Sequence, residues 1–178
     1  EFETVETYMT FDELGGINEI LPRSRNDAHK LIEECMLLAN VAAAEYALKH
    51  EVPMLYRIHE PPEFSRIQKV RDFVKLLGLP FPEQPTQADY QAVIDATKDR
   101  IDAPSIHAVL LRSMMQAYYG PNNAGHYGLA YDAYTHFTSP IRRYPDLLLH
   151  RSIKAHLKNK PSPLSGAASD EAGTHFSG

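Results

Sequence analysis

A run of apolar residues at helical spacing dominates the first third of the sequence. These residues recur three or four positions apart, and they are Ala28, Leu31, Ile32, Cys35, Ala39, Ala42, Ala43 and Tyr46. This spacing places them on one face of an α-helix, and Asn26-Asp27 in front of the run offers a helix cap. We therefore predict one long helix over about 27–49. Leu37 and Leu38 fall off this face, which indicates burial on more than one side.

Prolines and glycines divide the rest of the chain into shorter elements. Alternating residues on either side of Gly15-Gly16 predict a β-hairpin over 2–22, and residues 54–58 form a short extended stretch. Helical spacing of apolar residues predicts three further helices, at 62–77, 87–99 and 104–118.

The C-terminal part combines a strand pattern with a further helix start. Residues 125–131 alternate like a strand. The Thr-Ser-Pro sequence at 138–140 is typical of a helix start, because a hydroxyl cap precedes a proline in the first turn. We predict a helix from there to about Lys158, with a kink or restart at Pro145. The Pro, Ser, Gly and Ala residues of 159–178 predict a linker or a disordered tail.

The composition indicates an ordinary globular protein, since 43% of the 178 residues are hydrophobic and 23% are charged. No apolar run reaches the roughly 18 residues of a membrane span. The single cysteine, Cys35, excludes an internal disulfide and favours a reducing, cytoplasmic setting. The sequence opens on acidic Glu1-Phe2-Glu3 without a methionine, so we interpret it as cut from a longer protein.

Charge gives two opposed indications about nucleic acids. The formal net charge is −5, which opposes nucleic-acid binding because phosphate contacts need Lys and Arg. Four basic residues nevertheless gather in one segment, and they are Arg142, Arg143, Arg151 and Lys154. The global charge therefore opposes nucleic-acid binding, whereas the local charge supports it.

The predicted start of the last helix is the strongest candidate for a binding site. A helix start presents free backbone N–H groups and the positive end of a dipole, and both suit a phosphate. Arg142 adds a planar fork that can hold a phosphate through two hydrogen bonds. Thr138 and Ser139 either donate further hydrogen bonds or only cap the helix. The alternative is a capped surface helix whose arginines pair with Asp132 or Asp146.

Three segments carry a resemblance to a known family. They are RNDAHKLIEECM at 25–36, GHYGLA at 125–130 and HFTSPIRRYPDL at 136–147, followed by His150-Arg151. Together they resemble the catalytic (RNB) domain of the ribonuclease II/ribonuclease R family, and they are most similar to its ribonuclease R branch. The resemblance covers about residues 1–158 and is specific, because long motifs occur in the right order and spacing.

The resemblance implies a mixed α/β (α+β) fold, in which several helices pack on a small sheet to form the C-terminal part of an RNB domain. It implies a 3′→5′ exoribonuclease that hydrolyses single-stranded RNA processively to nucleoside 5′-monophosphates, with Mg²⁺ as its cofactor. The implied partners are single-stranded RNA, the remainder of the RNB domain and accessory RNA-binding domains of the same chain, and no membrane.

The resemblance also assigns roles to individual residues. Arg142 matches the family arginine that contacts the scissile phosphate, which makes it the catalytic candidate. Glu33 matches a glutamate that contacts the 3′-terminal nucleotide, although a solvated carboxylate beside Glu34 is the alternative. Phe2 lies where the family has an aromatic residue that stacks on a base, with core packing as the alternative. Further RNA-binding candidates in the same motif are Thr138, Ser139 and Arg143.

The metal-binding residues that the family uses have no match in this sequence. The family holds its metals on an aspartate cluster in the N-terminal half of the domain, and the aspartates here are scattered, among them Asp12, Asp27, Asp72 and Asp89. The histidines lack the tight spacing of a metal site, and we interpret His126 as structural. We therefore expect the metal ligands outside this chain. We also expect the isolated chain to be inactive and prone to self-association.

Two other functions stay open. A non-catalytic RNA-binding or scaffolding chain with the same fold predicts RNA affinity that falls with salt, without turnover. A helical protein-interaction domain unrelated to RNA predicts neither RNA affinity nor an effect of changing Arg142.

Overall fold

The structure is a computed structural model that describes residues 7–12, 15–22, 26–164 and 172–176. The chain divides into two compact units, Glu1–Cys35 and Met36–Gly178. Helix α1 (Asp27–Lys49) begins in the first unit and ends in the second.

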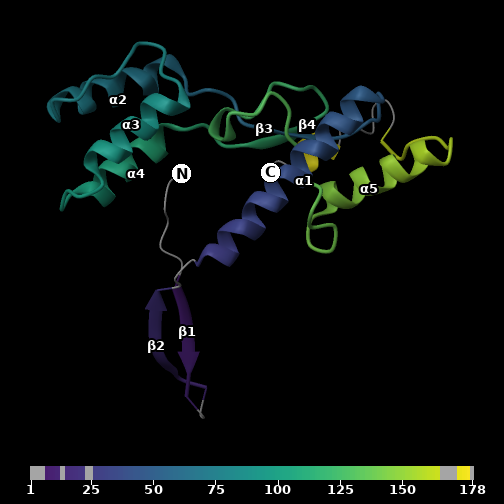
Figure 1. The fold of residues 1–178 in the computed structure, drawn as a ribbon, viewed down its shortest axis with the longest axis horizontal. Coiled ribbons are helices and arrows are strands. Elements are labelled where there is room, and N and C mark those ends of the chain that lie inside the picture. Colours follow the sequence, from purple (N-terminus) through teal and green to yellow (C-terminus); the bar gives the residue numbers. More distant parts are fainter. Residues whose placement is uncertain (1–6, 13–14, 23–25, 165–171, 177–178) are drawn as a thin grey trace. The chain divides into compact units, whose positions relative to one another are not determined.

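The first unit contains an antiparallel hairpin of β1 (Thr7–Phe11) and β2 (Ile17–Pro22), drawn in purple in Figure 1. Its turn uses a positive φ of 80° at Gly15, a backbone conformation that glycine adopts without strain. The backbone N–H of Gly16 donates to the carboxylate of Asp12 at 2.7 Å. The predicted hairpin is confirmed over these two strands, whereas residues 2–6 of the prediction lie outside the described residues.

Helix α1 has the predicted bounds and the predicted cap. The Asn26 side chain accepts a hydrogen bond from the backbone N–H of His29 at 3.0 Å, which satisfies one of the unpaired donors of the first turn. Its buried residues are Asn40, Ala43, Ala44 and Ala47, all on one face. Leu38 is 66% exposed, so it does not add the second buried side that its position in the sequence indicated.

The second unit is built around the short strands β3 (Tyr56–Ile58) and β4 (Tyr118–Gly120), which pair antiparallel. A Cβ added at Gly120 would lie only 3.0 Å from the side chain of Ile58. Glycine at this position therefore leaves room for the Ile58 side chain of the neighbouring strand. One core cluster joins residues from α1, β3, α5 (Tyr144–Leu157) and the loops between them, and it consists of Ala43, Ala44, Ala47, Val52, Met54, Tyr56, Ile58, Ala133 and Leu149.

The remaining helices of this unit are α2 (Phe64–Leu76), α3 (Gln87–Thr97) and α4 (Ala103–Ser113), which lie together in Figure 1. Helix α4 packs against both α2 and α3. Their fully or nearly buried side chains include Val70, Val74, Tyr90, Val93, Ile106 and Leu110. The three predicted helices are confirmed, but the last ends at Ser113 rather than 118, because Tyr118 already belongs to β4.

The strand predicted at 125–131 is wrong. This segment contains a short 3₁₀ helix, η1 (Tyr127–Leu129), and only isolated bridges at His126. Gly125 and Ala130 have φ values of +75° and +57°, and left-handed residues at both ends cannot continue an extended chain. His126 Nδ1 also accepts from the backbone N–H of Leu129 at 3.2 Å, which closes the turn locally.

The helix predicted to start at 138–140 is also wrong, whereas its restart at Pro145 is confirmed. Helix α5 begins at Tyr144 and has its proline in the first turn. Proline lacks an N–H and its ring clashes with the carbonyl four residues earlier, so a helix cannot run from residue 139 through Pro145 undisturbed. Asp146 lies inside the first turn of α5 and is completely buried.

Parts of the C-terminal segment 159–178 pack against other residues of the second unit. Leu164 is buried with Leu55 and Leu148, and Ala172 and Phe176 pack against the same cluster. Residues 172–176 are helical. The prediction of a linker or disordered tail therefore does not describe these residues.

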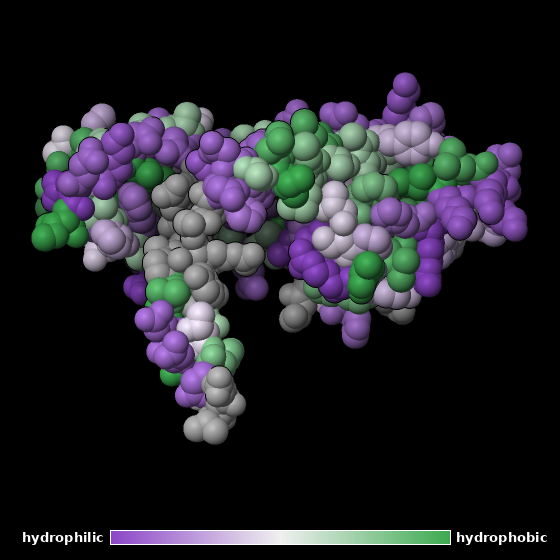
Figure 2. Space-filling view, turned by 60° about the horizontal axis from the view of Figure 1, so that its bottom comes forward, coloured by the Kyte–Doolittle hydropathy of each residue, from purple (hydrophilic) through white to green (hydrophobic). Residues whose placement is uncertain are grey.

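The surface mixes hydrophilic and hydrophobic side chains, as the purple and green atoms of Figure 2 show for one face. Large hydrophobic residues are exposed in both units, among them Met9, Phe11, Leu31, Leu38, Leu76 and Leu157. No helix among the described residues is long and apolar enough to cross a membrane. Short antiparallel strands combined with several helices confirm the predicted mixed α/β fold class.

Two leucines of α5 test this description of the core. Leu149 is 1% exposed and Leu157 is 68% exposed. We expect Leu149→Ala to lower the free energy of unfolding by about 2–5 kcal/mol, because it leaves a cavity in the core. We expect Leu157→Ala to change it by less than about 0.5 kcal/mol. Urea unfolding followed by circular dichroism measures both, and equal losses would contradict the assignment of the core.

Candidate functional site

Residues 139–143 form a single tight turn in front of α5, which we call the arginine turn. The backbone N–H groups of Arg142 and Arg143 both donate to the carbonyl of Ser139, at 3.3 and 3.0 Å. Arg143 then adopts an extended conformation and α5 begins at Tyr144. The sequence favours this arrangement because Pro145 has to lie in the first turn of a helix.

The carboxylate of Asp146 holds the arginine turn in place. Asp146 is 0% exposed, and one of its oxygens accepts from the backbone N–H of Ser139 at 2.8 Å. The guanidinium of Arg143 donates to both oxygens, from Nε at 3.0 Å and from a terminal nitrogen at 2.9 Å. A buried charge is tolerated when it is both paired and hydrogen-bonded. The interaction therefore fixes the backbone of the turn and the direction of Arg143.

Arg142 and Arg143 face different surroundings although they are neighbours in sequence. Arg143 is largely buried against Asp146. Arg142 is exposed, and none of the side-chain hydrogen bonds or ion pairs found among the described residues involves it. Ile141 beside it is fully exposed as well. The arginine turn therefore presents one guanidinium fork to solvent, which is the geometry that binds a phosphate or a carboxylate.

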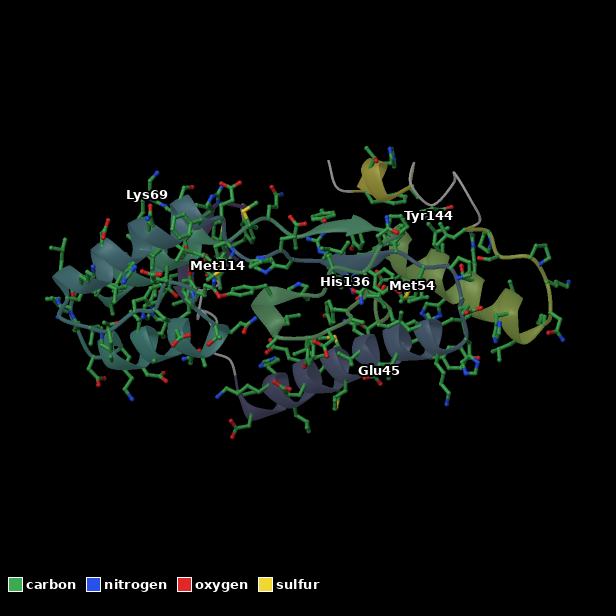
Figure 3. The ribbon with its side chains drawn as sticks, turned by 90° about the horizontal axis from the view of Figure 1, so that it is seen from above. Glu45, Met54, Lys69, Met114, His136 and Tyr144 are labelled. Carbon is green, nitrogen blue, oxygen red and sulfur yellow. The ribbon has the colours of Figure 1, made fainter. Side chains whose placement is uncertain are left out.

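The segment in front of the turn is anchored to its surroundings at successive residues. The hydroxyl of Thr135 donates to the carbonyl of Leu55 at 2.7 Å. The ring of His150 stacks on Phe137 with centroids 4.0 Å apart, and its Nε2 lies 2.9 Å from the Phe137 carbonyl. Figure 3 labels His136 in this segment and Tyr144 at the start of α5. The segment that precedes the turn is therefore held by contacts with the rest of the second unit.

Two histidines in this part of the chain, His126 and His136, are partly buried. Burial, reinforced by the neighbouring His59, lowers the pKa of His126 to about 4. Burial and the positive charge of Arg143 lower the pKa of His136 to about 4. His136 Nδ1 shares a 2.6 Å hydrogen bond with the hydroxyl of Tyr119. Both imidazoles are therefore neutral at pH 7, so neither adds positive charge beside the turn.

A second cation and an aromatic ring lie on the first turns of α5. Arg151 is exposed, and its guanidinium carbon lies 6.0 Å from the centroid of the half-exposed Tyr144 ring. A terminal nitrogen of Arg151 is 3.5 Å from the Tyr144 hydroxyl. Proteins that bind single-stranded nucleic acids combine exposed arginines with aromatic faces in this way.

The structure brings four of the predicted site residues into one segment, namely Thr138, Ser139, Arg142 and Arg143. Glu33 is half-buried on α1 in the first unit. Phe2 lies outside the described residues. No sequence pattern pointed to Asn40, whose buried side chain contacts residues 134, 137 and 138.

The described residues were compared with the ligand sets that bind metal ions in proteins. Among the described residues, no three His, Cys, Asp or Glu side chains come together in a way that could hold a metal ion. Location of the Mg²⁺ ligands outside this chain stays a prediction.

Comparison with known proteins gives a consistent family. The model of the RNB domain matches residues 1–159. Ribonuclease R from Vibrio cholerae is 48% identical over 179 residues, which cover 99% of this chain and 22% of that protein. The chain therefore spans about a fifth of the length of such a relative.

Solved structures of similar fold include a ribonuclease R and a pseudonuclease. Ribonuclease R from Mycoplasma genitalium, solved in complex with ribose-methylated single-stranded RNA, matches with a TM-score of 0.80 and 27% identity, over 98% of this chain and 28% of that chain. Yeast Ssd1, described as a pseudonuclease, matches with a TM-score of 0.74 and 26% identity, over 86% of this chain and 20% of that chain.

The two histidines of low pKa predict how stability depends on pH. The unfolded chain binds protons at these positions near pH 6.5, whereas the folded chain does so only near pH 4. The unfolded state therefore takes up protons first, and the free energy of unfolding should fall as the pH is lowered from about 6.5 to about 4. Urea unfolding at a series of pH values measures this slope.

The matched variant is His136→Gln, which removes one of the two titrating groups. We expect a shallower slope over the same pH range, because one proton fewer is taken up on unfolding. Leu149→Ala is the control, since it should lower the whole curve without changing its slope. An unchanged slope in His136→Gln would contradict the assignment of a buried neutral imidazole.

Proposed function

This chain belongs to the RNB domain family, and on that premise we propose that the natural protein carrying it is a 3′→5′ exoribonuclease. Its substrate is single-stranded RNA, which it hydrolyses processively to nucleoside 5′-monophosphates. The observation that carries the proposal is the exposed guanidinium of Arg142 on a turn that Asp146 fixes. This turn lies inside the segment that the RNB domain model matches.

In this proposal Arg142 binds the scissile phosphate. Its planar fork donates two hydrogen bonds to the phosphate oxygens and offsets the negative charge that grows on them in the transition state. The arginine turn holds this fork ready, so little reorganisation is needed when the phosphate arrives. Thr138 and Ser139 supply hydroxyl donors beside it.

Arg143 contributes to the same site mainly by holding the turn. Its hydrogen bonds go to Asp146, whose negative charge offsets its own, so it keeps the turn in place beside the phosphate. Glu33 contacts the 3′-terminal nucleotide and Phe2 stacks on a base, as the family resemblance implies. These two roles rest on that resemblance alone.

The wider setting follows from the same family membership. We propose that Mg²⁺ is bound by residues outside this chain, in the remainder of the RNB domain, and that accessory RNA-binding domains belong to the same natural protein. A cytoplasmic location fits the single exposed Cys35. The exposed hydrophobic residues of both units favour self-association when the chain is isolated, and the isolated chain should be inactive.

A second function is supported by the similarity to yeast Ssd1, which is described as a pseudonuclease. The same fold could bind RNA without cleaving it and serve as a scaffold. In that case RNA affinity should fall steeply with salt while no product appears with Mg²⁺.

The test uses the natural protein carrying this sequence and a 5′-labelled single-stranded RNA in the presence of Mg²⁺. We expect the RNA to shorten from its 3′ end. We expect Arg142→Ala to lower kcat by roughly 10²–10³-fold, as the loss of one transition-state donor does elsewhere. Arg142→Lys should recover only part of the rate, because lysine keeps the charge but lacks the fork.

Arg112→Ala is the matched control, because Arg112 is an exposed arginine at the end of α4. We expect it to leave kcat unchanged. If Arg142→Ala and Arg112→Ala behave alike, the role of Arg142 is wrong. If the folded natural protein binds RNA without cleaving it, the scaffold function replaces the exonuclease.

A further inference from the structure

Asn40 makes three hydrogen bonds from a buried position on α1. Its side chain is 4% exposed. The amide nitrogen donates to the hydroxyl of Tyr134 at 2.9 Å. The amide oxygen accepts from the backbone N–H groups of Phe137 and Thr138, at 2.9 and 3.3 Å. One side chain therefore connects α1 with a segment that lies almost a hundred residues later in the sequence.

The orientation of this amide is fixed by its partners. Two backbone N–H groups can be satisfied only by an acceptor, so the oxygen of Asn40 has to face Phe137 and Thr138. If the amide were reversed, its NH2 group would face the backbone N–H groups of Phe137 and Thr138. Donors would then face donors, and both backbone N–H groups would lose their acceptor. Because an unpaired buried polar group is costly, the arrangement has no alternative of similar energy.

These contacts place the residues that lead directly into the arginine turn. Thr138 precedes Ser139, whose N–H is held by Asp146. The carbonyl of Tyr134 accepts from the backbone N–H of Arg57 on β3 at 2.8 Å. The chain is thus held from β3 and from α1 before the turn, and from α5 within it.

We propose that Asn40 is a positioning residue for Arg142, which acts by accepting the backbone N–H groups of Phe137 and Thr138. This inference rests on the proposed function of Arg142. The Asn40 side chain is buried and its hydrogen bonds go to other residues of the protein, so it acts through the segment that it holds and not on the RNA. A displacement of the arginine turn by a fraction of an ångström moves the Arg142 fork away from the phosphate.

Two substitutions in the natural protein separate this role from simple packing. Asn40→Leu has a similar size but offers no acceptor, whereas Asn40→Asp keeps an oxygen for both N–H groups. We expect Asn40→Leu to lower kcat for single-stranded RNA by about 10- to 100-fold, since misplacement of a catalytic group by about 1 Å has effects of this size. KM should change little, because the other RNA contacts remain. Asn40→Asp should stay within a few-fold of the wild-type kcat.

Val74→Ala controls for loss of stability alone. Val74 is fully buried in α2, outside the arginine turn and the segment that Asn40 contacts. It should lower the melting temperature while kcat of the folded protein is kept. A wild-type kcat in Asn40→Leu, or an equal loss in Asn40→Leu and Asn40→Asp, would overturn the inference.

Amide hydrogen exchange gives a readout that does not depend on activity. Phe137 and Thr138 should exchange slowly in the wild type and in Asn40→Asp, and fast in Asn40→Leu. If the wild-type protein does not cleave RNA, the proposed function fails and this exchange still decides whether Asn40 holds the segment. Slow exchange of both amides in Asn40→Leu would then overturn the inference.

Discussion

The geometry of this site depends on the hydrogen bonds that the buried carboxylate of Asp146 accepts. Three N–H donors from Ser139 and Arg143 converge on its two oxygens. Removing one member of such a buried pair leaves an uncompensated charge and typically costs about 3–5 kcal/mol. The turn between Ser139 and α5 therefore has one well-defined conformation. In that conformation Arg143 points inward and Arg142 outward, so the two neighbouring arginines have different roles.

The core of the second unit also holds the segment before the turn in a defined position. Small residues of α1 pack closely against β3 and α5, which brings Asn40 and His150 within reach of the same loop. Neutral His136 lies beside Arg143 without competing for Asp146. The positive charge of the site is consequently concentrated on a few arginines, which reconciles a net charge of −5 with the proposed binding of an anion there.

The sequence predicts those parts of this structure that local patterns determine. Helix α1, its Asn26 cap and the hairpin turn at Gly15 follow from spacing and turn chemistry. The role predicted for Arg142 rests on its place in a specific motif and stays a prediction. The arginine turn was not predicted, because the sequence Thr-Ser-Pro is compatible both with a helix start and with a turn. Only the hydrogen bond from Ser139 to Asp146 distinguishes the two. Asn40 could not be found either, since its partners are almost a hundred residues away.

A double-mutant cycle on the natural protein tests most directly whether Asp146 acts through the turn that presents Arg142. The rate of RNA hydrolysis is measured for the wild type, Asp146→Asn, Arg142→Ala and the double variant. If Asp146 positions Arg142, Asp146→Asn should slow the wild type strongly and have almost no further effect in the Arg142→Ala background. Equal losses in both backgrounds would contradict the account, because Asp146 would then act independently of Arg142.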